Sequence, residues 1–153
     1  MEIKELKKRP HFNEDKKLAD SYSQFDRFLG ELKKRDLPED IVNSINRNID
    51  EINAVSETDK WGKQLKKTQS CLIKKMEKET KLVPKHYYRN TWLAVGMATF
   101  GIPLGLVFGI SLGNMAFLAI GLPIGMGIGI AVGTAMDKKA LEEGRQLDLE
   151  IKY

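Results

Sequence analysis

The chain has 153 residues, with 25 Lys and Arg against 21 Asp and Glu, and these charges are strongly segregated. Residues 90–136 form 47 consecutive positions without Asp, Glu, Lys, Arg or His. A single soluble globular domain carries charged groups over its whole surface. The segregation of charge therefore excludes a chain that folds as one such domain. Only 89 residues precede the uncharged block, which also excludes a large enzyme domain.

The net charge of +4 is distributed unevenly along the chain. Residues 1–59 carry a net charge of −3, residues 60–89 carry +8, and residues 137–153 carry −1. The basic excess therefore directly precedes the uncharged block. Clustered Lys and Arg bind nucleic-acid phosphates or anionic lipid headgroups. Because an apolar block follows, we favour the lipid interpretation over the nucleic-acid one.

The pattern predicts a flexible lead-in over residues 1–12, followed by a soluble helical region over 13–84. Asn13 is expected to cap the first helix, with Glu14 and Asp15 in its first turn, where the helix dipole favours anions. Apolar residues at spacings of three and four predict one buried stripe on this helix: Leu18, Tyr22, Phe25, Leu29 and Leu32.

Two further amphipathic helices are expected in this region. Pro38 suits the first position of the second helix, whose buried face is Ile41, Ile45, Ile49 and Ile52. The third helix is expected to begin at Ser56 and to end at Pro84. Its inner face is predicted to be Trp61, Leu65, Thr68, Leu72, Met76 and Val83. Three such stripes can bury one another in a small antiparallel bundle, or in an assembly with other copies.

The uncharged block is long enough for a transmembrane hairpin over 87–137. A spanning helix needs about 20 mostly apolar residues. The turn-forming pair Gly113 and Asn114 divides the block into spans over 91–112 and 115–136. Aromatic rings at its entry suit the membrane interface: Tyr87, Tyr88 and Trp92. The alternative is a soluble protein with a buried hairpin, which would need more covering elements than this chain offers.

The block contains an internal repeat with an offset of 20 residues. Its two copies are GIPLGLVFGISLG over 101–113 and GLPIGMGIGIAVG over 121–133, and each is a GxxxGxxxGxxxG run. Residues four apart share one helix face, and small residues there let another backbone approach closely. The predicted helix-packing residues are Gly101, Gly105, Gly109, Gly113, Gly121, Gly125, Gly129 and Gly133. Counted from the turn, the two columns overlap only partly in depth, which favours oligomers.

The two runs and the MDKK sequence that follows them resemble the small bacterial glycine-zipper membrane proteins, most of which have no assigned activity. The resemblance covers residues 91–139. It implies a membrane hairpin that self-associates, and it carries over no catalytic residue. The expected fold class is therefore all-α, with cytoplasmic amphipathic helices followed by a two-helix transmembrane hairpin with glycine zippers.

The basic flanks of the hairpin predict its orientation. Positive residues are retained on the cytoplasmic side, so both termini are expected there, in a bacterial inner membrane. The residues expected to contact lipid headgroups are Lys74, Lys75, Lys78, Lys81, Lys85, Arg89, Lys138 and Lys139. The tail, residues 138–153, alternates apolar and polar residues from Leu147 onward. This predicts either a strand that pairs with another tail or a partner's sheet, or a disordered end.

No pattern typical of an enzyme or a cofactor site is visible. The glycines lie four apart inside apolar stretches, unlike a phosphate-binding loop, and the two histidines have no metal-ligand spacing. The primary hypothesis is a self-associating membrane anchor for a cytoplasmic scaffold, with membrane lipid, other copies and a cytoplasmic protein as partners and no cofactor. The alternative is an oligomeric pore, although the spans hold no ionisable residue. A membrane-tethered nucleic-acid binder is less favoured.

Overall fold

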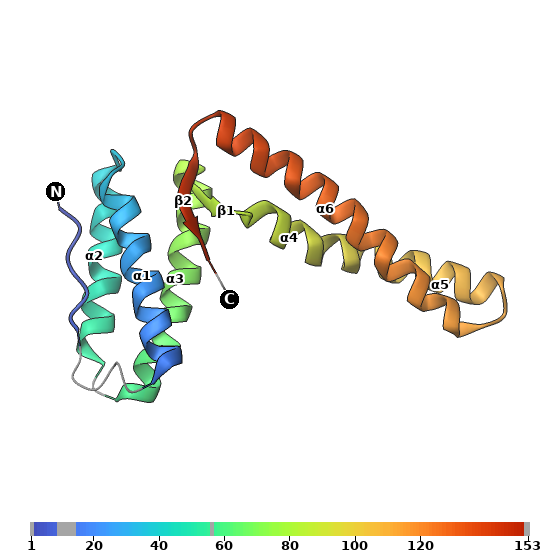
Figure 1. The fold of residues 1–153 in the computed structure, drawn as a ribbon, viewed down its shortest axis with the longest axis horizontal. Coiled ribbons are helices and arrows are strands. Elements are labelled where there is room, and N and C mark those ends of the chain that lie inside the picture. The colour runs from blue at the N-terminus through green and yellow to red at the C-terminus, as the bar shows by residue number, and fades with distance from the viewer. Residues whose placement is uncertain (1, 9–14, 56, 152–153) are drawn as a thin grey trace. The chain divides into compact units, whose positions relative to one another are not determined.

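The computed structural model describes residues 2–8, 15–55 and 57–151. It is mostly helical (Figure 1). The elements in chain order are α1 (Lys16–Lys33), α2 (Glu39–Ala54), α3 (Thr58–Thr80), β1 (Val83–Lys85), α4 (Tyr87–Gly96), a π-helical turn (Met97–Gly101), α5 (Ile102–Ser111), a 3₁₀ turn (Met115–Phe117), α6 (Leu118–Glu142) and β2 (Gln146–Glu150).

The chain divides into two compact units. The first, called here the bundle unit, comprises Met1–Val83 and Leu147–Tyr153. The second, called here the hairpin unit, comprises Pro84–Gln146. The division agrees with the segregation of charge along the sequence.

The bundle unit buries the apolar stripes of α1, α2 and α3 against one another. All the predicted inner residues of α1 and α2 are buried, and so are those of α3 up to Met76. Phe28, which the stripe of α1 omitted, is also fully buried. The rings of Tyr22 and Trp61 stack with their centroids 6.1 Å apart, which joins α1 to α3. The sequence prediction of a three-helix core is thus confirmed.

The helix starts differ from the sequence prediction by a few residues. Asp15, rather than Asn13, caps α1: its carboxylate accepts hydrogen bonds from the backbone N–H groups of Lys17 and Leu18. Asn13 and Ser56 lie outside the described residues. Pro38 is the N-cap of α2 rather than its first residue, and Glu57 is the N-cap of α3.

The expectation of a flexible lead-in is wrong for residues 2–8, which pack against the bundle. Ile3 and Leu6 are 7% and 5% exposed, and the Tyr22 hydroxyl donates to the Leu6 carbonyl over 3.2 Å. Two apolar residues in a basic stretch were too few to show a periodicity. Their burial depends on the groove that α1 and α2 form.

The end of α3 also differs from the prediction. The helix stops at Thr80 because Lys81 adopts a left-handed conformation with φ +58°. Val83 is buried, but in β1 rather than on the inner face of a helix. Strand β1 pairs with β2, so the tail finds its partner strand within its own chain. This corrects the expectation of pairing with another tail or of a disordered end. Leu147, the first inward residue of β2, is fully buried.

Helix α6 ends at a glycine, as its sequence indicates. Gly144 has φ +68° and donates to the Leu141 carbonyl over 3.0 Å, while Arg145 donates to the Ala140 carbonyl over 2.8 Å. This is the Schellman pair of hydrogen bonds that closes a helix C-terminus. Glycine has no Cβ penalty in this left-handed conformation.

Candidate functional site

The interior of the hairpin is built from glycine alone. Between residues 90 and 136 the buried residues are eight glycines: Gly96, Gly101, Gly105, Gly109, Gly121, Gly125, Gly129 and Gly133. Every larger side chain in this stretch is exposed or half-buried. Soluble helical hairpins have the opposite arrangement, with large apolar residues between the helices.

The backbones of the two long helical segments meet across these glycines. A Cβ atom added at Gly125 would lie 2.5 Å from both the Gly96 carbonyl oxygen and the Gly101 nitrogen. One added at Gly105 would lie 2.6 Å from the Leu118 carbonyl oxygen. Backbone atoms cannot move aside as a flexible side chain can. Alanine is therefore too large at these positions.

The two predicted glycine columns overlap only partly in depth, as the sequence indicated: a Cβ atom added at Gly121 or Gly125 would meet the backbone of Gly101. Near the turn, Gly109 faces Met115, and at the other end Gly133 faces the backbone of Tyr88 and Arg89. The partial overlap does not leave the rest of each groove open, because Gly109, Gly129 and Gly133 face other residues of the opposite segment. The other helix of the same chain fills each groove.

A π-helical turn brings Gly96 onto the glycine face. Gly96 precedes Gly101 by five residues rather than four. The four-residue repeat in the sequence therefore does not include it. Within the turn, the Ile102 N–H donates to the Met97 carbonyl, five residues back. The wider turn aligns a spacing of five with the same face. It lies just before Pro103, where an α-helix would lose a hydrogen bond.

Two glycines of the hairpin have no packing role. Gly113, predicted to pack between helices, has no atom within 4 Å of an added Cβ and has φ +65°. It makes the turn between α5 and the 3₁₀ turn, as the expected break at Gly113 and Asn114 required. Gly127 in α6 likewise faces open space.

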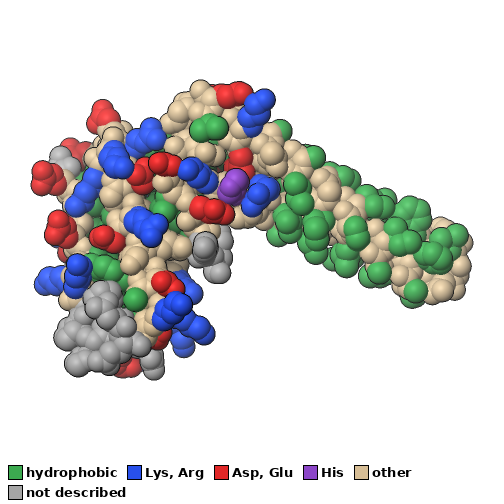
Figure 2. Space-filling view, in the orientation of Figure 1, with side chains coloured by type: hydrophobic (Ala, Val, Ile, Leu, Met, Phe, Trp, Pro, Cys, Tyr) green, Lys and Arg blue, Asp and Glu red, His purple; other side chains and the backbone are tan. Residues whose placement is uncertain are grey.

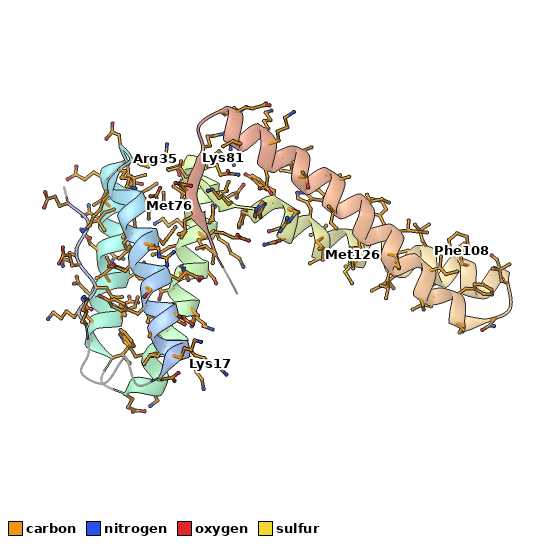
Figure 3. All side chains as sticks on the ribbon, viewed as in Figure 1. Lys17, Arg35, Met76, Lys81, Phe108 and Met126 are labelled. Atoms are coloured by element: carbon orange, nitrogen blue, oxygen red, sulfur yellow. The ribbon has the colours of Figure 1, made fainter. Side chains whose placement is uncertain are left out.

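The outer surface of the hairpin is apolar. Figure 2 shows hydrophobic side chains along the length of this unit, whereas charged ones gather on the bundle and at the base of the hairpin. The most exposed large apolar residues are Ile110 at 72%, and Met115 and Leu141 at 62% each. Phe108, 38% exposed, lies on the same surface (Figure 3). In a monomeric soluble protein such a patch would favour aggregation.

Two helical segments are long and apolar enough to cross a membrane. They are Tyr87–Ser111, with 25 residues, and Met115–Glu142, with 28. At 1.5 Å per residue, each exceeds the roughly 30 Å of hydrocarbon in a bilayer. The predicted spans over 91–112 and 115–136 lie within these segments, apart from the last residue of the first. The expected break between them is confirmed.

Asp137 closes the base of the hairpin, a role the sequence analysis missed. Its side chain is buried, and its two carboxylate oxygens accept hydrogen bonds of 3.0 Å from the backbone N–H groups of Tyr88 and Arg89. These N–H groups belong to the first turn of α4, where no preceding carbonyl is available. The N-cap residue of α4, His86, forms no side-chain hydrogen bond to the helix. An aspartate from α6 thus caps α4 across the hairpin.

A second polar cluster follows the end of α6. The guanidinium of Arg145 pairs with the carboxylate of Glu143 and is also held by the Tyr88 hydroxyl. These contacts, the one to Glu143 above all, raise the pKa of Arg145, so this residue stays charged. The cluster joins the chain after α6 to the first turn of α4.

The residues predicted to contact headgroups divide between the two units. Four of them belong to the hairpin unit, where the Arg89 N–H donates to Asp137: Lys85, Arg89, Lys138 and Lys139. Lys138 and Lys139 form loose pairs with Glu142 and Glu143, at 3.8 and 3.9 Å. The others belong to α3 or its C-cap: Lys74, Lys75, Lys78 and Lys81.

The lysines of α3 form one exposed stripe, called here the lysine stripe. It comprises Lys60, Lys63, Lys67, Lys74, Lys78 and Lys81, with Cys71 at its centre. Spacings of three and four keep these seven residues on one face of the helix, and all seven are exposed. Lys81, at the C-cap, is labelled in Figure 3.

The described residues hold no group of three or more His, Cys, Asp or Glu side chains that suits a metal ion. In comparisons with known proteins, no family model, curated protein or solved structure matches the chain. The candidate site is therefore defined by its geometry alone. Glycines lie between the two helical segments, apolar side chains cover the outside, and Asp137 caps α4 at one end.

Proposed function

We propose that the chain is an integral membrane protein whose glycine-zipper hairpin anchors a helical scaffold domain at the membrane surface. The observation that carries the proposal is the arrangement of the hairpin between residues 90 and 136, where glycines alone are buried and the large apolar residues face outward. In water, this arrangement exposes most of the apolar surface. In a bilayer, the same surface meets lipid chains at no cost.

The packing of the hairpin fits a lipid environment for a second reason. Lipid chains are as apolar as leucine, so helices in a membrane associate through close backbone contact rather than by burying large apolar residues. Glycines at the helix contact permit such an approach, which also allows weak Cα–H···O bonds. One charged residue near the middle of a span costs about 3 kcal/mol. Residues 90–136 contain none.

The two ends of the hairpin differ in a way that supports one orientation. Arg89, Lys138 and Lys139 lie at its base, whereas the turn around Gly113 carries no charge. Basic residues next to a span are retained in the cytoplasm. We therefore place both termini there, and the resemblance to bacterial glycine-zipper proteins favours a bacterial inner membrane.

An anchor fits the hairpin better than a pore does. Thr99, one of its few polar residues, donates its hydroxyl hydrogen to the Val95 carbonyl over 2.8 Å and so satisfies itself within the helix. Ion pathways usually have charged or polar linings. The glycine face, which could have joined hairpins into a ring, is filled from within the same chain. Contacts between copies would then involve the outer surface or the bundle unit.

The anchor is tested by membrane fractionation of the full chain with reporter fusions at Met1 and Tyr153. We expect the protein to resist extraction by alkaline carbonate and both reporters to give cytoplasmic signals. Release by carbonate would contradict the anchor, and a signal from the outer side at either end would contradict the orientation. Unitary conductance of the purified chain in planar bilayers would favour the pore instead.

A further inference from the structure

The side chains of two asparagines of α2 form hydrogen bonds with the main chain of residues 2–8. The Lys4 N–H donates to Asn46 Oδ1 over 2.8 Å, and Asn46 Nδ2 donates to the Glu2 carbonyl over 3.0 Å. Asn53 repeats the pattern three residues further along the segment. It accepts from the Lys7 N–H over 3.0 Å and donates to the Glu5 carbonyl over 3.4 Å.

The two asparagines are spaced to match an extended peptide. They lie seven residues apart on α2, about 10.5 Å along the helix axis at 1.5 Å per residue. The backbone groups they bind are three residues apart, and three residues of extended chain cover about 10 Å. Each asparagine therefore meets the same pair of backbone groups in successive repeats. The segment follows α2 in the same direction, as Figure 1 shows.

Side chains of the segment fill sites with the same three-residue repeat. Ile3 and Leu6 are buried in the bundle, and the Tyr22 hydroxyl holds the Leu6 carbonyl. Between them, Lys4 pairs with Asp50 of α2, with 2.6 Å from Nζ to Oδ2. The groove thus binds an extended main chain that carries two apolar residues three positions apart and one basic residue between them.

We propose that this groove also binds residues 2–8 of a second copy of the chain, so that two membrane-anchored copies exchange their N-terminal segments. Exchange replaces every contact of the segment by an identical one and requires no new surface. The chain between Lys8 and Asp15 spans seven residue steps, which reach at most about 25 Å when extended. That reach lets the segment enter the groove of an adjacent copy.

The inference rests on the proposed function in one respect. Anchoring in a membrane raises the local concentration of copies, and a tethered segment then binds as if intramolecularly. The groove itself does not depend on the membrane. A test in detergent therefore separates segment exchange from anchoring, which fractionation measures.

The test is a complementation between two full-length variants with different affinity tags. The donor carries Asn46→Ala and Asn53→Ala, which disable its groove and leave its segment intact. The acceptor carries Ile3→Asp and Leu6→Asp, which unseat its own segment and leave its groove intact. Mixed in mild detergent, the tagged acceptor should retain the donor. Donors alone or acceptors alone should not pair.

The controls identify what holds the donor. Adding Asn46→Ala and Asn53→Ala to the acceptor should lower retention at least about thirtyfold, because four hydrogen bonds are lost and each contributes a factor of about two or more. Asn43→Ala, at an exposed position of the same helix, should leave retention unchanged. A synthetic peptide of residues 1–8 should displace the donor. If the acceptor binds this peptide but retains no donor, a second copy is not the occupant and the proposal is wrong.

A second acceptor guards against misfolding of the Asp variants. A protease site inserted between Pro10 and His11 allows the intact folded chain to be cut and its segment washed out. This acceptor should retain the donor as the first does, with a helical content equal to that of the parent. Failure of a correctly folded acceptor to retain the donor would overturn the proposal.

Discussion

At the scale of single residues, Asp137 shows how one polar group can close an apolar hairpin. Asp137 directly follows the uncharged residues 90–136. Its carboxylate accepts hydrogen bonds from two N–H groups of α4 that have no partner within the helix. A capping carboxylate is stabilised both by these hydrogen bonds and by the positive end of the helix dipole. The residue therefore joins the two ends of the uncharged block.

We predict that Asp137→Ala destabilises the hairpin by about 1 kcal/mol, the usual cost of losing an N-cap. The measurement is thermal unfolding in detergent, combined with hydrogen exchange at the amides of Tyr88 and Arg89. Both amides should exchange faster in the variant. The control Glu142→Gln removes an exposed carboxylate on the same helix, which pairs with Lys138 at 3.8 Å, and should have little effect. Unchanged exchange at both amides would show that Asp137 is not the cap.

Glu31 connects the tail to the bundle in a pH-dependent way. Its carboxylate accepts from Lys34 Nζ over 2.5 Å and from the Asp148 N–H over 3.2 Å. The bond from Lys34, followed by the one from Asp148, lowers the pKa of Glu31 although partial burial opposes this. A lowered pKa means that the ionised form stabilises the fold. This stabilisation is present above the ordinary Glu pKa and is lost as the pH falls through the lowered value.

We predict that Glu31→Gln lowers the free energy of unfolding by about 1 kcal/mol at neutral pH. As the pH falls below the ordinary Glu pKa and through the lowered pKa of Glu31, the difference from the parent should shrink, since Glu31 then becomes protonated in the parent too. Denaturant unfolding between pH 3 and pH 8 measures it. Glu51→Gln, at an exposed position of α2, serves as the control. A difference that stays constant with pH would contradict a role for the ionised carboxylate.

At the scale of elements, the hairpin depends on which glycines face the opposite helix. Gly125 and Gly127 are neighbours in α6, yet an added Cβ meets the Gly96 and Gly101 backbone at the first position and open space at the second. The repeat in the sequence indicates the column of Gly125. It does not indicate Gly96, because only the π-helical turn puts that residue on the same face.

We predict that Gly125→Ala destabilises the hairpin by about 1–3 kcal/mol, the usual cost of overpacking a close contact. Gly127→Ala is the matched control and should be neutral or slightly stabilising, since alanine is the better helix former. Circular dichroism during heating in detergent compares the two variants. Equal melting temperatures would show that the helices do not meet at the glycine face.

The lysine stripe of α3 is the second element with an unassigned surface. The helix ends at Thr80 and the first candidate span begins at Tyr87, so its last turn stays within about 25 Å of the hairpin whatever the arrangement of the two units. In the proposed membrane anchor, a basic helix face this close to the bilayer would be attracted to anionic headgroups by about 1 kcal/mol for each lysine near the surface. Cys71, the single cysteine, lies in the middle of this face.

At the scale of the whole molecule, we predict that the lysine stripe contacts anionic lipid around the anchor. A polarity-sensitive fluorophore on Cys71 should shift to the blue in nanodiscs with anionic lipid, but not in neutral ones. High salt should reverse the shift because the Debye length falls from about 10 Å at 0.1 M to 3 Å at 1 M. Lys67→Gln with Lys74→Gln should weaken it, because two of the six lysines of the stripe lose their charge. Lys16→Gln with Lys17→Gln, at exposed positions of α1, is the control. An equal shift in neutral nanodiscs would exclude an electrostatic contact.

The sequence alone determined the features that depend on local pattern. Apolar stripes at helical spacing gave the three helices of the bundle, because a helix buries one face whatever its neighbours are. The uncharged block and the pair Gly113 and Asn114 gave two long apolar helical segments and the turn between them. The alternation from Leu147 onward indicated a strand.

The tertiary structure decided every feature that needs a partner distant in sequence. The two apolar residues of the lead-in gain stability only in the groove beside Asn46 and Asn53. Since the sequence does not show this groove, it predicted a flexible lead-in. The tail had no visible partner because β1 has three residues, too few to show a period. Asp137 and Gly96 acquire their roles only when α6 lies against α4. A sequence pattern records what one segment must bury, whereas the choice of the surface that covers it is made when the chain folds.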